Sequence, residues 1–164
     1  MFDNLFEMAR QISKNRDEII EKLLSFVQTD LMFFWGSEKD LIEQQEKLWR
    51  PLLEWASYEF DINYKITQSL DVPTVDASDE LKMRAFLESL SDKELAGFYV
   101  AASNVKSILI AAALVKKRIS AEEAFNAALL EEHWQAEVWG SVDEAESRQM
   151  EIRKELKLVE DFLK

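Results

Sequence analysis

Apolar residues recur every three to four positions along most of this chain, which is the spacing of one face of an α-helix. In the first half the pattern predicts helices over residues 2–13, 16–27, 38–58 and 78–90. A proline at position 51 either kinks the third of these helices or opens a new one.

Helix starts are marked more sharply in the second half. Ser91, Ser120 and Ser141 each precede a glutamate by three residues, directly before an amphipathic run. In such a capping box the serine oxygen accepts from the backbone amide three residues on, and the glutamate reaches back. Gly140 suits a left-handed helix end. The predicted helices are 92–117, 121–139 and 142–163.

Between these helices the pattern changes twice. Residues 60–67 alternate between apolar and polar positions, as a short extended segment would, but they are too isolated to build a sheet. Residues 71–77 predict a loop. The whole chain, residues 1–164, is therefore predicted to be a single all-α domain: compact, of about six helices, with at most one short extended segment.

Composition supports this prediction. Three glycines and two prolines in 164 residues favour long helices over a many-stranded sheet. The net charge of −12 argues against a nucleic-acid partner, because phosphate contacts need a basic patch. There is no cysteine, so the sequence does not indicate whether the protein resides in a reducing or an oxidising compartment. The apolar stretch 95–115 includes Asn104 and Lys106, which favours a buried central helix over membrane insertion.

Two charges stand on apolar helical faces. Glu131 shares its face with alanines, Trp134 and Val138, and Lys106 lies inside the most apolar segment. A carboxylate buried in such a stripe needs a charged or hydrogen-bonding partner, because its desolvation otherwise costs free energy. Either Lys106 and Glu131 form a buried ion pair that fixes the register of two helices, or Glu131 marks a docking site.

Catalytic interpretations find little support. His133 is the only histidine, so no histidine-based metal cluster can form, and its pairing with Glu137 is typical of an exposed helical pair. No phosphate-binding glycine loop or nucleophile elbow is present. An all-carboxylate metal site stays open among 32 acidic residues. We expect no enzyme activity, no cofactor and no bound metal.

The acidic residues are unevenly distributed. Between Ile119 and Ser147 there is no lysine or arginine. One interpretation is a solvated helical hairpin with acids near helix starts. The other is an anionic docking face around Trp134 and Trp139, where aromatic anchors lie beside charges that steer encounter.

This order of motifs resembles the assembly chaperones of the F-type ATP synthase that bind the α subunit of the catalytic head. The family's C-terminal signature corresponds to Leu130-Glu131, Trp134-Gln135, Trp139-Gly140 and Val142-Asp143. Thr29-Asp30, the segment 49–55 with its two tryptophans, and Lys106-Ser107 match further family segments in the right order. The similarity covers nearly the whole chain.

The chain departs from the family pattern in three ways. Arg50 stands where the family usually has aspartate, and Ala145-Glu146 stands where the signature usually ends in Ala-His. Family members also carry a small β-rich N-terminal domain of which nothing is seen in these residues. Both a truncated chain and a reduced, helical-only member fit that difference.

The resemblance implies a non-catalytic chaperone that binds the free α subunit and prevents its aggregation before β subunit arrives. The family's functionally important glutamate falls on Glu131. The implied partner-binding residues are Glu131, Trp134, Gln135, Trp139, Gly140 and Asp143. By family analogy the compartment is the bacterial cytoplasm, with the mitochondrial matrix as the alternative; the oligomeric state stays open. The alternative function is a helical adaptor that self-associates through Phe33, Phe34 and Trp35.

Overall fold

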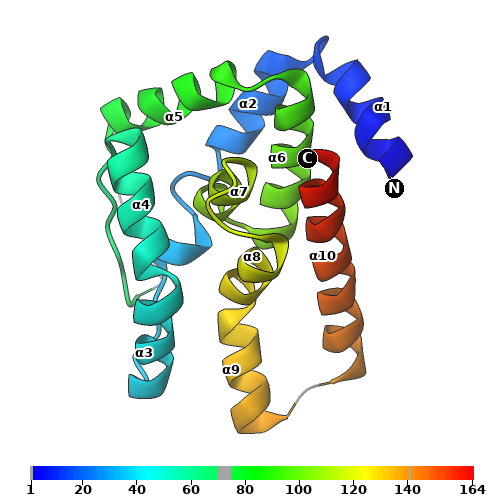
Figure 1. The fold of residues 1–164 in the computed structure, drawn as a ribbon. Coiled ribbons are helices and arrows are strands. Elements are labelled where there is room, and N and C mark those ends of the chain that lie inside the picture. Colours follow the sequence, from blue (N-terminus) through cyan, green and yellow to red (C-terminus); the bar gives the residue numbers. More distant parts are fainter. Residues whose placement is uncertain (1, 70–74, 141) are drawn as a thin grey trace.

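The computed structural model describes residues 2–69, 75–140 and 142–164 (Figure 1). This part of the chain forms ten α-helices and one 3₁₀ turn. In chain order they are α1 (Phe2–Ile12), α2 (Arg16–Leu24), η1 (Leu31–Phe33), α3 (Lys39–Leu48), α4 (Arg50–Phe60), α5 (Ala77–Ser89), α6 (Asp92–Val105), α7 (Ile108–Val115), α8 (Ala121–Ala128), α9 (Leu130–Trp139) and α10 (Asp143–Phe162).

The predicted all-α class is confirmed. Among the described residues, extended pairing is limited to one isolated parallel bridge between Phe34 and Thr67, at the end of the predicted extended segment. The helix count exceeds six because three predicted helices divide. The first division follows from Pro51, which occupies the first turn of α4 and so opens a new helix after Trp49.

The second division, at Lys106, matters more for the site. This residue has a left-handed backbone with φ of 59° and ends α6. Ser107 then caps α7, its hydroxyl oxygen accepting from the Ile110 amide at 3.0 Å. All eight residues of α7 are buried, so α7 is the apolar centre of the fold. No helix within the described residues combines the length and hydropathy needed to cross a bilayer.

Two of the three predicted capping boxes are confirmed. Ser91 and Ser120 each accept from the expected glutamate amide at 3.1 Å while the glutamate carboxylate accepts from the serine amide at 3.0 Å. Ser141, and most of the predicted loop 71–77, lie outside the described residues. The last helix starts at Asp143, after Val142.

The helices pack around α6 and α7. α1 and α10 flank α6, α8 packs against both α7 and α10, and α3 and α4 form a further column that contacts α7 and α9. In Figure 1, α3, α9 and the start of α10 extend toward the lower end of the molecule, while the chain termini lie at the upper right. Most of the predicted partner-binding residues thus lie away from the termini.

Candidate partner-binding surface

The base of α9 is held against α3 and α4 by a buried tryptophan. Trp49 is completely buried between α3 and α4, and its indole N–H donates to the carbonyl of Ala127 at 2.7 Å. Ala127 lies in the last turn of α8, just before α9 begins. This bond satisfies a helix-end carbonyl and fixes where α9 starts relative to α3.

Gln45 makes a second contact between α3 and α9. Its side chain is fully buried on α3, and its Oε1 accepts from the Gly36 amide at 3.2 Å. Its Nε2 donates to Oε1 of Glu131 at 3.3 Å. The backbone at Gly36 approaches Leu41 so closely that an added Cβ would lie 2.3 Å from the leucine side chain, so a larger residue there would require that side chain to move.

Trp134 adds a third contact between the same helices. Its indole N–H donates to Oδ2 of Asp40, at the start of α3, at 2.8 Å. This hydrogen bond to the Asp40 carboxylate is charge-assisted and exposed, whereas the hydrogen bond from Gln45 to Glu131 is partly buried. Two side chains one turn apart on α9, Glu131 and Trp134, therefore face α3.

Glu131 is half-buried, and no cation of the described residues lies within ion-pair distance of its carboxylate. Burial raises the pKa of its carboxyl above the ordinary value, and the negative charge of Glu38 raises it further. Within the described part of the chain, its carboxylate makes the single hydrogen bond to Gln45 and no ion pair. The carboxylate is thus partly desolvated and lacks the opposite charge that would offset this cost.

The predicted ion pair between Lys106 and Glu131 is wrong. Lys106 is exposed at the left-handed end of α6 rather than inside a continuous apolar helix. The prediction treats residues 92–117 as one helix, whereas α6 ends at Val105 and α7 starts at Ile108, so Lys106 does not lie on the apolar face of a continuous helix. Of the two interpretations of Glu131, this removes the one based on Lys106.

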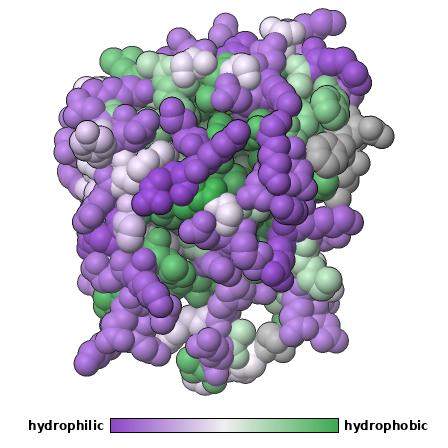
Figure 2. Space-filling model, in the orientation of Figure 1, coloured by the Kyte–Doolittle hydropathy of each residue, from purple (hydrophilic) through white to green (hydrophobic). Residues whose placement is uncertain are grey.

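The other predicted residues lie at the far end of α9. Gln135 and Asp143 are exposed, and Trp139 is 81% exposed. Gly140 ends the helix with a positive φ of 84° and open space around it. Figure 2 shows hydrophobic and intermediate atoms at this lower end, among hydrophilic ones. We call the exposed apolar residues there the α9–α10 tip: Val138, Trp139 and Val142.

The predicted residues thus divide into two groups. Glu131 and Trp134 are fixed against α3, whereas Gln135, Trp139, Gly140 and Asp143 are exposed without such contacts. His133 is half-buried and packs on the Phe125 ring, with centroids 5.4 Å apart, rather than lying fully exposed as predicted. Glu132 forms an ion pair with Arg148 of α10.

The aromatic segment before Gly36 does not form the self-association patch considered above. Phe33 is 6% exposed and Trp35 7% exposed, and the half-buried Phe34 packs on the core. The Arg50 guanidinium stacks 4.9 Å from the Trp35 ring centroid and bonds the Tyr64 hydroxyl. Arg50, where the family usually has aspartate, is therefore part of the internal framework.

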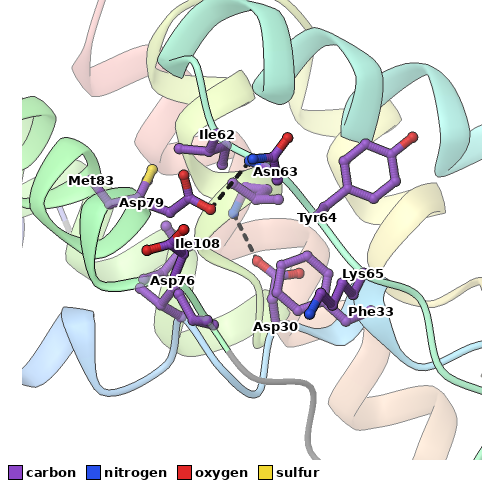
Figure 3. Close-up of a pocket in the computed structure, with 13 residues that line it drawn as sticks. Asp30, Phe33, Ile62, Asn63, Tyr64, Lys65, Asp76, Asp79, Met83 and Ile108 are labelled. Atoms are coloured by element: carbon purple, nitrogen blue, oxygen red, sulfur yellow. Dashed lines mark hydrogen bonds between the residues drawn. The ribbon is translucent and has the colours of Figure 1, made fainter.

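A cavity of about 330 Å³ lies on another part of the molecule, between η1, the segment 62–65, α5 and the start of α7 (Figure 3). Asp30 is completely buried there, accepting from the Met32 and Leu109 amides at 3.0 Å and from the Ser107 hydroxyl at 2.8 Å. Burial outweighs these bonds and raises the pKa of Asp30 to about 6.

In Figure 3, Asp79 extends from α5 toward Asn63, whose amide donates to it at 3.2 Å. Among the described residues, no three histidine, cysteine, aspartate or glutamate side chains are arranged to hold a metal ion. The Asp30 and Asp79 carboxylates fasten chain segments together. The role of Asp30 was not predicted from the sequence, where only its place in the Thr-Asp motif was evident.

Known proteins resemble this chain in both sequence and fold. The family model described as ATP12 chaperone protein matches residues 1–57. The mitochondrial protein atp12 of Schizosaccharomyces pombe is 26% identical over 145 residues, covering 82% of this chain and 49% of that protein. The crystal structure of Atp12 from Paracoccus denitrificans matches with a TM-score of 0.89 and 26% identity, covering 93% of this chain and 66% of that one. These matches support a relationship of this chain to the ATP12 chaperone family.

A mutant of the Paracoccus denitrificans family member matches equally, with a TM-score of 0.89. A protein from Agrobacterium tumefaciens, 24% identical, shares the fold with a TM-score of 0.81, covering 93% of this chain and 59% of that one. The chain spans about half the length of the curated relative. The likeness to ATP12 proteins therefore concerns this helical portion of them.

Proposed function

We propose that this chain is a non-catalytic chaperone of ATP synthase assembly that binds the free α subunit and prevents its aggregation until β subunit associates. The observation that carries the proposal is the match of nearly the whole described fold to an ATP12 chaperone, at a TM-score of 0.89. One relative is a mitochondrial protein and another is bacterial, which supports the bacterial cytoplasm or the mitochondrial matrix as its compartment.

The proposed binding surface is the face of α9 together with the α9–α10 tip. Exposed apolar side chains that lie together and are rimmed by polar residues often mark an interaction site. Trp139 offers an aromatic anchor, while Glu137 and Asp143 beside it are exposed acids that form no ion pair within the described residues. A client segment with apolar side chains flanked by lysine or arginine would match this surface in both chemistry and charge.

The half-buried Glu131 fits the same role. A carboxylate that is desolvated but has no cation beside it gains more from an incoming basic side chain than a fully solvated one does. Client binding should also require little further ordering of the Glu131 side chain, since α3 already holds it.

The test is co-expression with an ATP synthase α subunit, followed by size-exclusion chromatography. We expect the α subunit to co-elute with the chain and to become more soluble. Glu131→Lys should reduce recovery of soluble α subunit by about tenfold or more, because it places a cation where the client's cation would bind.

Glu151→Lys is the matched control, since Glu151 is exposed on α10 outside the proposed surface and its substitution changes the net charge equally. Circular dichroism should show both variants folded. If folded Glu131→Lys protects the α subunit as wild type does, Glu131 has no part in binding. If wild type leaves the α subunit insoluble, the proposed function fails for this chain.

A further inference from the structure

The buried side chain of Gln45 connects two parts of the proposed surface. Its carboxamide has one acceptor atom and one donor group, and the two face different partners. The acceptor Oε1 takes the Gly36 amide at 3.2 Å, and a backbone amide can only donate. The donor Nε2 must therefore point at Glu131, where it meets Oε1 at 3.3 Å.

This orientation cannot reverse at low cost. Turning the amide over would place its N–H₂ against the Gly36 N–H and its oxygen against the Glu131 carboxylate, leaving repulsion at both ends. Gln45 is completely buried, so its own carboxamide has no water to replace a lost contact.

We infer that Gln45 is a positioning residue for Glu131, holding its carboxylate ionised and aimed for the client from a fixed donor on α3. The inference rests on the proposed function, since it names how the binding residue is kept ready. Without that donor, nothing among the described residues opposes the two effects that disfavour the ionised form, burial and the Glu38 charge.

The experiment compares Gln45→Met with Gln44→Met. Methionine keeps the volume of glutamine but removes the donor, and Gln44 is the exposed neighbour on the same helix. The first readout is the carboxyl ¹³C titration of Glu131, assigned with Glu131→Gln. We expect it to move to higher pH in Gln45→Met and to stay in place in Gln44→Met.

The second readout is α-subunit capture as a function of pH. Gln45→Met should weaken capture about threefold or more on the acidic side of neutral, where Glu131 takes up a proton, with recovery as pH rises and Glu131 ionises again. A merely structural loss would not recover with pH. The other titratable groups near Glu131 are Glu38 and Asp40 beside it on the α3 side, and Glu132 and His133 on α9, and they are unchanged in every variant.

An unmoved Glu131 titration in folded Gln45→Met would overturn the inference, whatever happens to capture. A moved titration together with pH-dependent loss of capture would establish it. If wild type itself captures no α subunit, the proposed function fails, while the titration still decides whether Gln45 sets the state of Glu131.

Discussion

At the scale of the residue, Asp30 makes stability depend on pH in an unusual direction. Its pKa is about 6 in the folded protein and 3.8 for an unperturbed aspartate, so folding takes up a proton between these values and stability falls as pH rises through them. From pH 4.5 to pH 7 we expect the free energy of unfolding of wild type to fall relative to Asp30→Asn by about 2 kcal/mol. Urea unfolding followed by circular dichroism measures this difference. Parallel pH curves for the two proteins would mean that Asp30 ionises normally.

Glu131 shows how far the sequence alone could lead at this scale. Its helical neighbours correctly marked a carboxylate that is partly removed from water. Its partner could not be predicted, because Gln45 is 86 positions away and glutamine in an amphipathic pattern looks like a solvent-facing residue. A completely buried glutamine in the 38–58 segment becomes visible only when α3, α8 and α9 are packed together.

At the scale of the element, the start of α4 and the end of α8 are joined by the Trp49 indole. Trp49→Phe removes that hydrogen bond and leaves a gap in a fully buried position, so we expect a loss of about 2 to 4 kcal/mol in the free energy of unfolding. Trp139→Phe is the matched substitution at an exposed position and should change stability by less than about 0.5 kcal/mol. Chemical denaturation of both variants tests this. Equal losses would show that the Trp49 contact contributes no more than an exposed ring.

Helix starts were more predictable than helix ends. Ser91 and Ser120 carry a local hydrogen-bonding signal, and both start helices where expected. The break at Lys106 has no such signal, because lysine rarely adopts a left-handed backbone. That break follows from long-range contacts instead: the Lys106 carbonyl accepts from the Leu31 amide at 3.1 Å, and Asp30 binds the start of α7. Tertiary packing here decides where a local pattern ends.

At the scale of the whole molecule, attraction and retention of the client should depend on different residues. A chain of net charge −12 attracts a basic client over distances of about a Debye length, roughly 10 Å at 0.1 M salt, whereas an aromatic anchor acts only on contact. We therefore expect the double variant Glu137→Gln with Asp143→Asn to slow association with the α subunit at low salt and to weaken its salt dependence. Trp139→Ala should leave that salt dependence intact and speed dissociation by about tenfold.

Biolayer interferometry with immobilised chain and α subunit diluted from denaturant separates these two rates across a salt series. The substitutions are matched, because all three residues are exposed around Gly140 and none contacts the core. If Trp139→Ala changed the association rate and its salt slope while dissociation stayed constant, the tip would act by steering alone. If neither variant changed either rate, the client would bind elsewhere, and the exposed tip would need another explanation. Because an exposed tryptophan and a desolvated carboxylate lie on the same helix, the combination favours a client that supplies both an apolar surface and a cation.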